Sequence, residues 1–345
     1  MSQEPSPTSG PRISNGTAWH LDGAGFEEVA DPAPALLDSP EVAAALAAHG
    51  ERLPLLPATV YSLTHRIPIA EGRHLHVTES FTLKAWHRWP RRAALMLGGP
   101  VTRGSYWSIP VPGYDGPAMM AERGFFAYTV DYLGVGESYR PDDGNTVTLA
   151  DNVAALRQIL RYVRFFRAVP KVDVVAESIG GAMATQLAAD GDRVRGCVIS
   201  TILYKTLAHQ LIVSPEWTAF LNAFPDGYTR NPPESYDKFL VNTPNEQVRR
   251  YTYDTQPGGY PAGPFRWLAG GLPYFDPGLA RVPGLILVGK GDFVPGPDDP
   301  HDLAADYGTD GAKLVILDRA GHVPRIQSEE IAASYWAEVF NFIDP

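Results

Sequence analysis

The chain has 345 residues, of which 44% are hydrophobic and 20% are charged, so it can build one buried core with an insertion. Its formal net charge of -10, without any block of Lys and Arg, argues against nucleic acid as a partner. The start of the chain lacks a secretory signal pattern, and no apolar run approaches about 18 residues, so we expect a cytoplasmic protein with no membrane partner.

The first 56 residues are predicted to form an amino-terminal extension. Residues 1–18 are rich in Ser, Pro and Gly, and we expect them to be disordered because they bury too little apolar surface. Ser39 and Pro40 fit the cap and first position of a helix, and Gly50 ends the Ala-rich stretch that follows. This pattern predicts a short helix over residues 40–49.

The core is predicted to comprise residues 57–201 and 283–345. Residues 60–69 and 74–86 alternate apolar and polar side chains around a turn at Glu71 and Gly72, which predicts two antiparallel strands. Short, continuous apolar runs are typical of parallel strands that are covered on both faces. Such runs occupy residues 93–97, 125–130, 172–176, 194–199, 285–288 and 314–317.

Helical patterns alternate with these runs. Thr148 and Asp151 resemble a capping box, and an apolar helical face extends from there to Val163. A second amphipathic pattern follows Ser328 and closes the chain. Residues 202–282 interrupt the alternation with many aromatic side chains and scattered Pro and Gly, so we interpret them as an inserted lid.

The most informative motif is the hexapeptide at residues 176–181, in which Ser178 follows an apolar strand run and precedes a helical pattern. A serine on a tight turn from strand to helix is exposed at the edge of a sheet, and such a turn requires small neighbours. A serine that merely caps the helix remains an alternative interpretation.

This motif resembles the nucleophile elbow G-x-S-x-G of the α/β-hydrolase superfamily, with Ala176 in place of the first glycine and Gly180 as the second. The resemblance implies an α/β-hydrolase fold, with a mostly parallel central sheet flanked by helices and an inserted helical lid. It also implies that Ser178 is the catalytic nucleophile.

Two later turns also resemble this superfamily. Asp292, in the turn 289–295 after a strand run, is similar to the family's acid, and His322, in the turn 320–324, resembles its catalytic base. The chain order Ser, Asp, His is the order that the family uses. The neighbouring Asp298, Asp299 and Asp302 remain alternatives for the acid.

Residues 97–100 resemble the family's His-Gly-Gly-Pro turn, with Leu97 replacing the His. Pro100 has no amide hydrogen, so the resemblance implies that Gly99 donates one hydrogen bond to the developing oxyanion. The amide of Ile179 is the implied second donor. A simple Gly-Pro turn without this role remains the alternative.

Three further features bear on the site. Residues 131–138 resemble the family's D-x-x-G-x-G-x-S signature, and we expect Gly134 and Gly136 to shape a loop beside the site. Cys197 lies in an apolar run and is expected to be a buried hydrophobe. His74 and His76 share a strand face but lack ligands of fitting type nearby, so we predict no metal and no cofactor.

Together these residues predict a serine hydrolase that cleaves an ester, lactone or thioester of an apolar small molecule through an acyl-enzyme. A C–C bond hydrolase, or an acyltransferase or cyclase, could use the same triad. A non-catalytic module that binds a small molecule is the remaining alternative. The sequence does not decide the substrate or the oligomeric state.

Overall fold

The computed structural model describes residues 17–18, 21–22, 25–26, 59–99, 102–202, 204–205, 214–230, 237, 239–240, 242–255, 259–269, 275–308 and 310–345. The helix predicted over residues 40–49 lies outside these residues. So does the segment 1–18 that we expect to be disordered, apart from Thr17 and Ala18.

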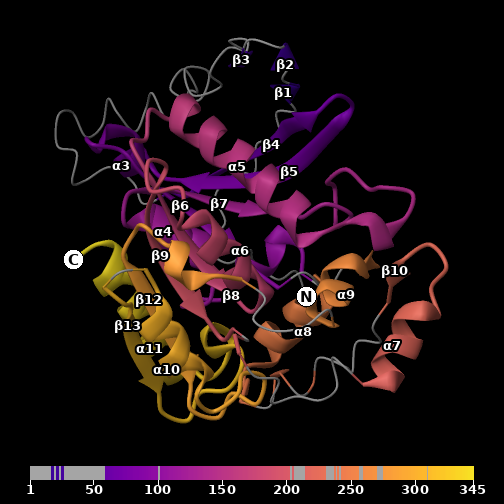
Figure 1. Cartoon of the computed structure of the whole chain (residues 1–345). Coiled ribbons are helices and arrows are strands. Elements are labelled where there is room, and N and C mark those ends of the chain that lie inside the picture. Colours follow the sequence, from indigo (N-terminus) through magenta and orange to yellow (C-terminus); the bar gives the residue numbers. More distant parts are fainter. Residues whose placement is uncertain are drawn as a thin grey trace, which may run out of the picture.

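The central layer of the protein is a nine-stranded sheet with the order β1-β4-β5-β7-β6-β8-β9-β12-β13 (Figure 1). β5 pairs antiparallel with β4 and β7, and all other neighbours pair parallel. The strands are β1 (Thr17–Ala18), β4 (Tyr61–Ala70), β5 (Arg73–Phe81), β6 (Arg92–Leu97), β7 (Phe125–Val130), β8 (Val172–Glu177), β9 (Val194–Ser200), β12 (Gly284–Gly289) and β13 (Lys313–Leu317). A separate pair joins β2 (Leu21–Asp22) to β3 (Gly25–Phe26).

Helices cover both faces of this sheet. On one face, α5 (Leu149–Phe166), α6 (Ile179–Leu187) and α10 (Asp299–Asp306) contribute to the larger hydrophobic core. On the other face, α4 (Gly116–Glu122) and α11 (Glu329–Ile343) pack in a second core. The predicted architecture, a mostly parallel central sheet flanked by helices, is confirmed.

Local predictions for the core are largely confirmed. The Thr148 hydroxyl accepts from the Asp151 amide at 3.0 Å, and the Asp151 carboxylate accepts from the Thr148 amide at 3.0 Å, which is the predicted capping box. Gly72 makes the predicted turn with a φ of 66°. Cys197 is buried as expected, and burial raises the pKa of its thiol to about 12.

Two predictions about strands are wrong. The strand expected over residues 74–86 ends at Phe81, and Leu83–His87 forms the short helix α3, whose start is held by Thr82 donating to the Ala121 carbonyl at 2.9 Å. The run 314–317 forms an edge strand in which Ile316 is 44% exposed, so it is not covered on both faces. Continuous apolar composition therefore did not distinguish an edge strand from a central one.

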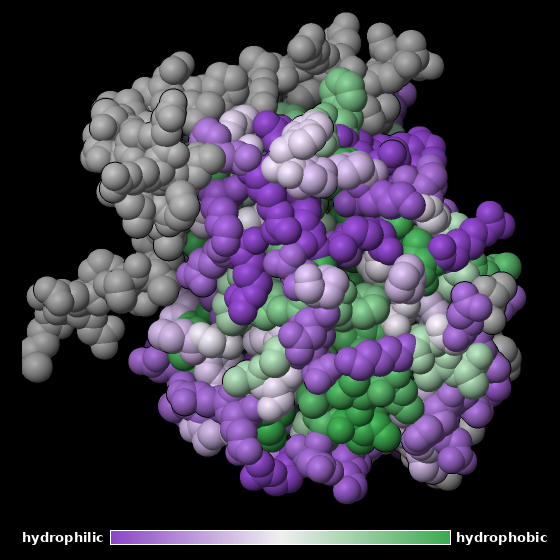
Figure 2. Space-filling model, turned by 90° about the vertical axis from the view of Figure 1, so that its left-hand side faces the viewer, coloured by the Kyte–Doolittle hydropathy of each residue, from purple (hydrophilic) through white to green (hydrophobic). Residues whose placement is uncertain are grey.

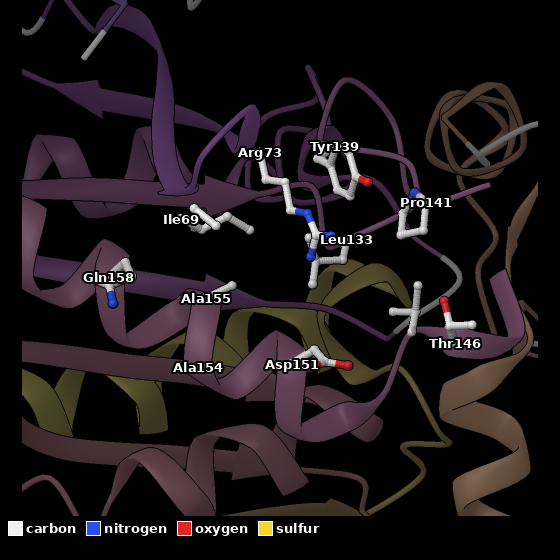
Figure 3. Close-up of a pocket in the computed structure, with 12 residues that line it drawn as sticks. Ile69, Arg73, Leu133, Tyr139, Pro141, Thr146, Asp151, Ala154, Ala155 and Gln158 are labelled. Atoms are coloured by element: carbon white, nitrogen blue, oxygen red, sulfur yellow. The ribbon is translucent and has the colours of Figure 1, made fainter. Parts of the chain in front are cut away.

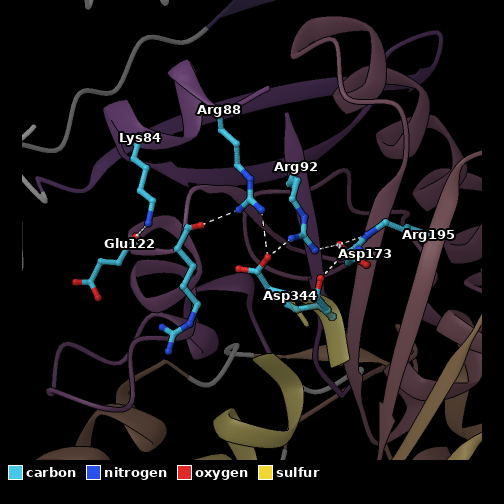
Figure 4. Close-up of polar contacts among 9 residues, drawn as sticks. Lys84, Arg88, Arg92, Glu122, Asp173, Arg195 and Asp344 are labelled. Atoms are coloured by element: carbon cyan, nitrogen blue, oxygen red, sulfur yellow. Dashed lines mark hydrogen bonds and ion pairs between the residues drawn. The ribbon is translucent and has the colours of Figure 1, made fainter. Parts of the chain in front are cut away.

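The carboxyl end of α11 is fixed to the sheet by ion pairs (Figure 4). Asp344 pairs with Arg88 at 3.1 Å and with Arg92, while Arg195 pairs with Asp173 at 2.7 Å and donates to the Ile343 carbonyl. Because α11 follows the loop that carries His322, its docking also limits where that loop can lie.

Residues 202–282 run between β9 and β12, and the structure describes part of them. Their helices and strands are α7 (Pro215–Asn222), β10 (Tyr228–Thr229), α8 (Glu246–Asp254), β11 (Tyr260–Pro261) and α9 (Gly263–Ala269). β10 and β11 pair antiparallel. Single 3₁₀ turns occur at Gly104–Trp107, Gly144–Thr146, Pro277–Leu279 and Pro324–Ile326.

The surface seen in Figure 2 is mainly hydrophilic, with hydrophobic residues gathered in one patch low in the view. None of the helices in the described part of the chain is both long and apolar enough to cross a bilayer.

Candidate active site

Ser178 lies in a sharp turn between β8 and α6, with a positive φ of 57°. Its amide donates to the Ser200 carbonyl of β9 at 2.9 Å, and its carbonyl accepts from the Gly181 amide at 2.8 Å. A side chain at Gly180 would place a Cβ 2.5 Å from the Leu97 carbonyl oxygen. The turn therefore requires glycine at position 180, as the predicted elbow does.

The structure brings the three predicted triad residues together. The Ser178 Oγ lies 3.4 Å from the His322 Nε2, and the His322 Nδ1 lies 2.9 and 3.1 Å from the two Asp292 carboxylate oxygens. The His322 and Asp292 side chains are only 6% and 1% exposed. The serine contact is longer than an ideal hydrogen bond, yet it lies within the range in which the imidazole can take the hydroxyl proton after a small side-chain adjustment.

Two of the three alternative acids have other partners. Asp299 accepts from the amides of Tyr204 and Lys205 at 3.1 and 2.9 Å, and Asp302 pairs with the Lys205 ammonium at 3.5 Å. Asp292 also accepts from the Val294 amide at 2.9 Å, which holds its carboxylate toward His322. The geometry therefore favours Asp292 over its neighbours as the partner of the histidine.

Both predicted oxyanion donors lie beside Ser178. A Cβ built on Gly99 would be 3.9 Å from the Ser178 Oγ, so the backbone of Gly99 borders the nucleophile. Ile179 is the first residue of α6, where amide hydrogens lie ahead of the helical hydrogen-bond ladder. Pro100 lies outside the described residues.

The loop that carries Gly99 is held by two hydroxyl groups. The Tyr132 hydroxyl donates to the Gly98 carbonyl at 2.9 Å, and the Thr102 hydroxyl donates to the Gly99 carbonyl at 2.8 Å. Burial, together with nearby Glu177, raises the pKa of Tyr132 well above its ordinary value, so Tyr132 remains a donor at neutral pH. These two hydrogen bonds fix the loop, although Leu97 stands where the family's His-Gly-Gly-Pro turn has His.

A sequence model of the alpha/beta hydrolase family matches residues 94–334, which is well over half of the chain. The chain belongs to the alpha/beta hydrolase family. It is accordingly an enzyme of the hydrolase type. No curated protein sequence is detectably similar to it.

Solved structures share the fold of this alpha/beta hydrolase at low sequence identity. A hydrolase from Pseudomonas aeruginosa is 19% identical, with 80% of this chain and 96% of the other covered and a TM-score of 0.61. The enol-lactonase from Burkholderia xenovorans is 18% identical, with coverage of 81% and 99% and a TM-score of 0.55. The naproxen esterase from Bacillus subtilis is 19% identical, with coverage of 89% and 99% and a TM-score of 0.54.

The Asp131 loop of this hydrolase is held in shape by contacts of the Asp131 carboxylate. The Asp131 carboxylate accepts from the Gly104 and Glu137 amides at 2.7 and 3.0 Å and lies 3.3 Å from the His76 ring. Burial raises the pKa of Asp131, but these hydrogen bonds outweigh it, and the net pKa is lowered. Gly136 has a φ of 56°, and a Cβ there would overlap the Asp131 carboxylate, which confirms that glycine shapes this loop.

Two hollows border Ser178. One is a cavity of about 80 Å³, and the other is a hollow of about 10 Å³. The larger is lined by Gly99, Thr102, Tyr106, Glu177, Ser178, Phe239, Leu240, Thr252, His322, Val323 and Ile326. The smaller is lined by Ser178, Ile179, Ala182, Thr201, Ile202, Trp267, Leu268 and Val294.

Aromatic rings surround the histidine in a way that the sequence analysis missed. The ring centres of Phe239 and Phe293 lie 5.2 and 6.2 Å from that of His322, and the two phenylalanine rings stack on each other at 5.6 Å. Phe293 follows the predicted acid directly, so its position offered a signal. Phe239 is one aromatic among many in residues 202–282, and nothing in the sequence singled it out.

A buried ion pair behind the nucleophile was also missed. The Arg325 Nε donates to the Glu177 carboxylate at 2.9 Å, and the Arg325 guanidinium lies 4.0 and 4.1 Å from the ring centres of Tyr106 and Trp107. Glu177 precedes Ser178, and Arg325 follows His322 by three residues. The partners are 148 residues apart in the chain, so no local pattern could have paired them.

Cavities elsewhere in the described structure are larger. Figure 3 shows one of about 430 Å³, where Arg73 lies over the Tyr139 ring and the start of α5 forms one wall. None of the predicted triad or oxyanion residues lines it. No group of three His, Cys, Asp or Glu side chains that could hold a metal ion occurs among the described residues. The candidate site therefore rests on the chemistry around Ser178 rather than on cavity size.

Proposed function

We propose that this protein is a serine hydrolase that cleaves an ester, lactone or thioester bond of an apolar small molecule through an acyl-enzyme. The observation that carries the proposal is the series of contacts from the Ser178 hydroxyl through the His322 ring to the Asp292 carboxylate. A hydroxyl becomes nucleophilic when an adjacent base accepts its proton, and the base works best when a third group orients it.

In the proposed reaction, the His322 Nε2 takes the proton of Ser178 as the hydroxyl attacks the carbonyl carbon. The Asp292 carboxylate accepts a hydrogen bond from the Nδ1–H group and stabilises the imidazolium that forms. The amides of Gly99 and Ile179 stabilise the negative charge on the carbonyl oxygen. The imidazolium then protonates the leaving group, and a water molecule that His322 activates releases the acid.

We further propose that residues 202–282 form a lid over this site. Six of the residues lining the two hollows come from this stretch, namely Ile202, Phe239, Leu240, Thr252, Trp267 and Leu268. Five of the six are apolar, which supports an apolar substrate because burying apolar surface favours binding. The stacked ring of Phe239 also shields the imidazole from water.

A fluorophosphonate probe tests the nucleophile directly. We expect the wild-type protein to be labelled at Ser178 and the Ser178→Ala variant to remain unlabelled, with intact-mass spectrometry as the readout. Absence of labelling in the folded wild type would favour a binding module without catalysis. The mass of the products from an ester substrate then separates water addition from transfer or cyclisation, and a test with a diketone reveals C–C cleavage.

A further inference from the structure

A second strained residue lies next to Ser178. Thr201 directly follows β9, Ser178 directly follows β8, and the last residues of these two strands, Glu177 and Ser200, are paired. Thr201 has a φ of 57°, the same as Ser178. A β-branched residue in this region is a genuine outlier, because its branched Cβ collides with the backbone. Such strained residues destabilise the fold and cluster at functional sites.

The Thr201 hydroxyl is buried and has no hydrogen-bond partner among the described residues. The residue as a whole is 1% exposed, so bulk water does not satisfy this hydroxyl. Buried polar groups are normally paired, and an orphan group calls for an explanation such as a ligand or a bound water. Glycine would be the simpler occupant of this position, because it adopts a positive φ without strain and brings no buried hydroxyl.

Thr201 also lines the smaller hollow beside the nucleophile. His322 lines the larger cavity that also borders Ser178, and it does not line this one. Because the imidazolium must protonate the leaving group, the leaving group belongs in the larger cavity. The acyl group therefore points toward Thr201, an assignment that rests on the proposed serine mechanism.

We propose that Thr201 is a specificity-determining residue whose hydroxyl binds a small polar substituent, such as a hydroxyl, on the acyl carbon next to the scissile carbonyl. The hollow has a volume of about 10 Å³, which matches one oxygen-sized group. Apart from Thr201, the nucleophile and the indole N–H of Trp267, the described side chains that line this hollow are apolar, so the Thr201 hydroxyl is the side-chain acceptor that this wall offers besides Ser178. The preferred substrates are thus 2-hydroxyacyl esters or thioesters with an otherwise apolar body.

The test compares two p-nitrophenyl esters that differ only by hydroxyl against methyl, the 2-hydroxypropanoate and the 2-methylpropanoate. In the Thr201→Val variant, the ratio of kcat/KM for the hydroxy ester to that for the methyl ester should fall about tenfold from the wild-type ratio, the loss of one buried hydrogen bond. Valine keeps the β-branched shape. The Thr201→Ser variant keeps the hydroxyl and should preserve the ratio, which separates hydrogen bonding from packing.

Thr185→Val is the matched control, because the Thr185 hydroxyl is equally buried but already bonds the Gly181 carbonyl at 2.9 Å within α6. It should leave the ratio unchanged. An unchanged ratio in Thr201→Val would overturn the proposal and would indicate that the hydroxyl binds only a trapped water molecule. An equal fall in both valine variants would overturn it as well.

A binding measurement in the Ser178→Ala background separates this proposal from the catalytic one. NMR titration with the two free acids should show weaker binding of the 2-hydroxy acid, by severalfold, after Thr201→Val is added, and little change for the 2-methyl acid. If the Ser178→Ala background shows this binding preference but the protein with Ser178 intact turns over neither ester, the serine mechanism is refuted and the role of Thr201 stands. If the protein with Ser178 intact turns over both esters and Thr201→Val changes no binding preference, the role of Thr201 is refuted and the serine mechanism stands.

Discussion

The buried ion pair between Glu177 and Arg325 joins the loop of the nucleophile to the loop of the base, and we expect its removal to weaken both stability and catalysis. Glu177 immediately precedes Ser178, and Arg325 lies three residues beyond His322. Their side chains are 5% and 0% exposed, so each charge depends on the other for compensation. The informative change is Arg325→Met, which keeps the apolar length of the side chain.

The magnitude follows from the geometry. At the observed 2.9 Å separation, the attraction between unit charges is about 6 kcal/mol if the effective dielectric constant is about 20. Much of this attraction offsets the cost of taking both charges out of water. Removing one partner leaves the other buried and unpaired, so Arg325→Met should lower the free energy of unfolding by about 3–5 kcal/mol.

The assay is urea denaturation of the wild type, Arg325→Met, Glu177→Leu and the double variant. Because the double variant removes both charges, it should cost less than the sum of the single changes, with a coupling of about 2–3 kcal/mol. Ester turnover should fall in Arg325→Met even where the protein is folded, since the two loops lose their link. A single-variant cost below about 1 kcal/mol, or additive costs, would refute this reasoning.

Three other changes probe the site and its frame. Asp292→Asn should reduce kcat by about 10³–10⁴ without unfolding the protein, because the amide favours the wrong imidazole tautomer; circular dichroism and ester kinetics check this. Gly180→Ala should abolish fluorophosphonate labelling, because its Cβ would lie 2.5 Å from the Leu97 carbonyl oxygen. Glu79→Gln should lower the unfolding free energy by about 3–5 kcal/mol at pH 7, since it removes the carboxylate that compensates the charge of the buried Arg167 guanidinium. Burial raises the pKa of Glu79, but the charge of Arg167 outweighs this effect and holds the pKa below 4.5. The wild type should therefore lose this stability as the pH falls below 4.5, whereas the Glu79→Gln variant should not. Urea titrations across pH measure the difference.

The sequence predicted the strands and turns of the site because each of its three key residues follows a strand with a recognisable apolar run. The run 172–176 gave the position of Ser178, and the runs 285–288 and 314–317 gave those of Asp292 and His322. Parallel strands end at one edge of a sheet, so residues far apart in the chain meet there. Periodicity and turn chemistry are local properties, and local patterns report them well.

Other features of the site depend on contacts between distant segments, which local patterns do not encode. The Tyr132 hydroxyl donates to the Gly98 carbonyl, and the Phe239 ring lies beside His322, although both pairs are far apart in the chain. The helix at residues 83–87 was predicted as a strand because its alternation of apolar and polar residues is compatible with either a strand or a short helix. Its conformation is fixed by packing of Leu83 and Ala85 in the core.

Backbone strain explains why the chemistry gathers where β8 and β9 end. Inside a parallel sheet the ladder holds every residue in extended conformation, so a positive φ can occur only where the chain leaves it. Ser178 and Thr201 are the first residues to do so on two paired strands, and each keeps one amide bonded to the neighbouring strand, at 2.9 Å to Ser200 and 3.3 Å to Leu287. The sheet thus supplies the restraint that holds both residues in strained conformations, and both residues line the same hollow.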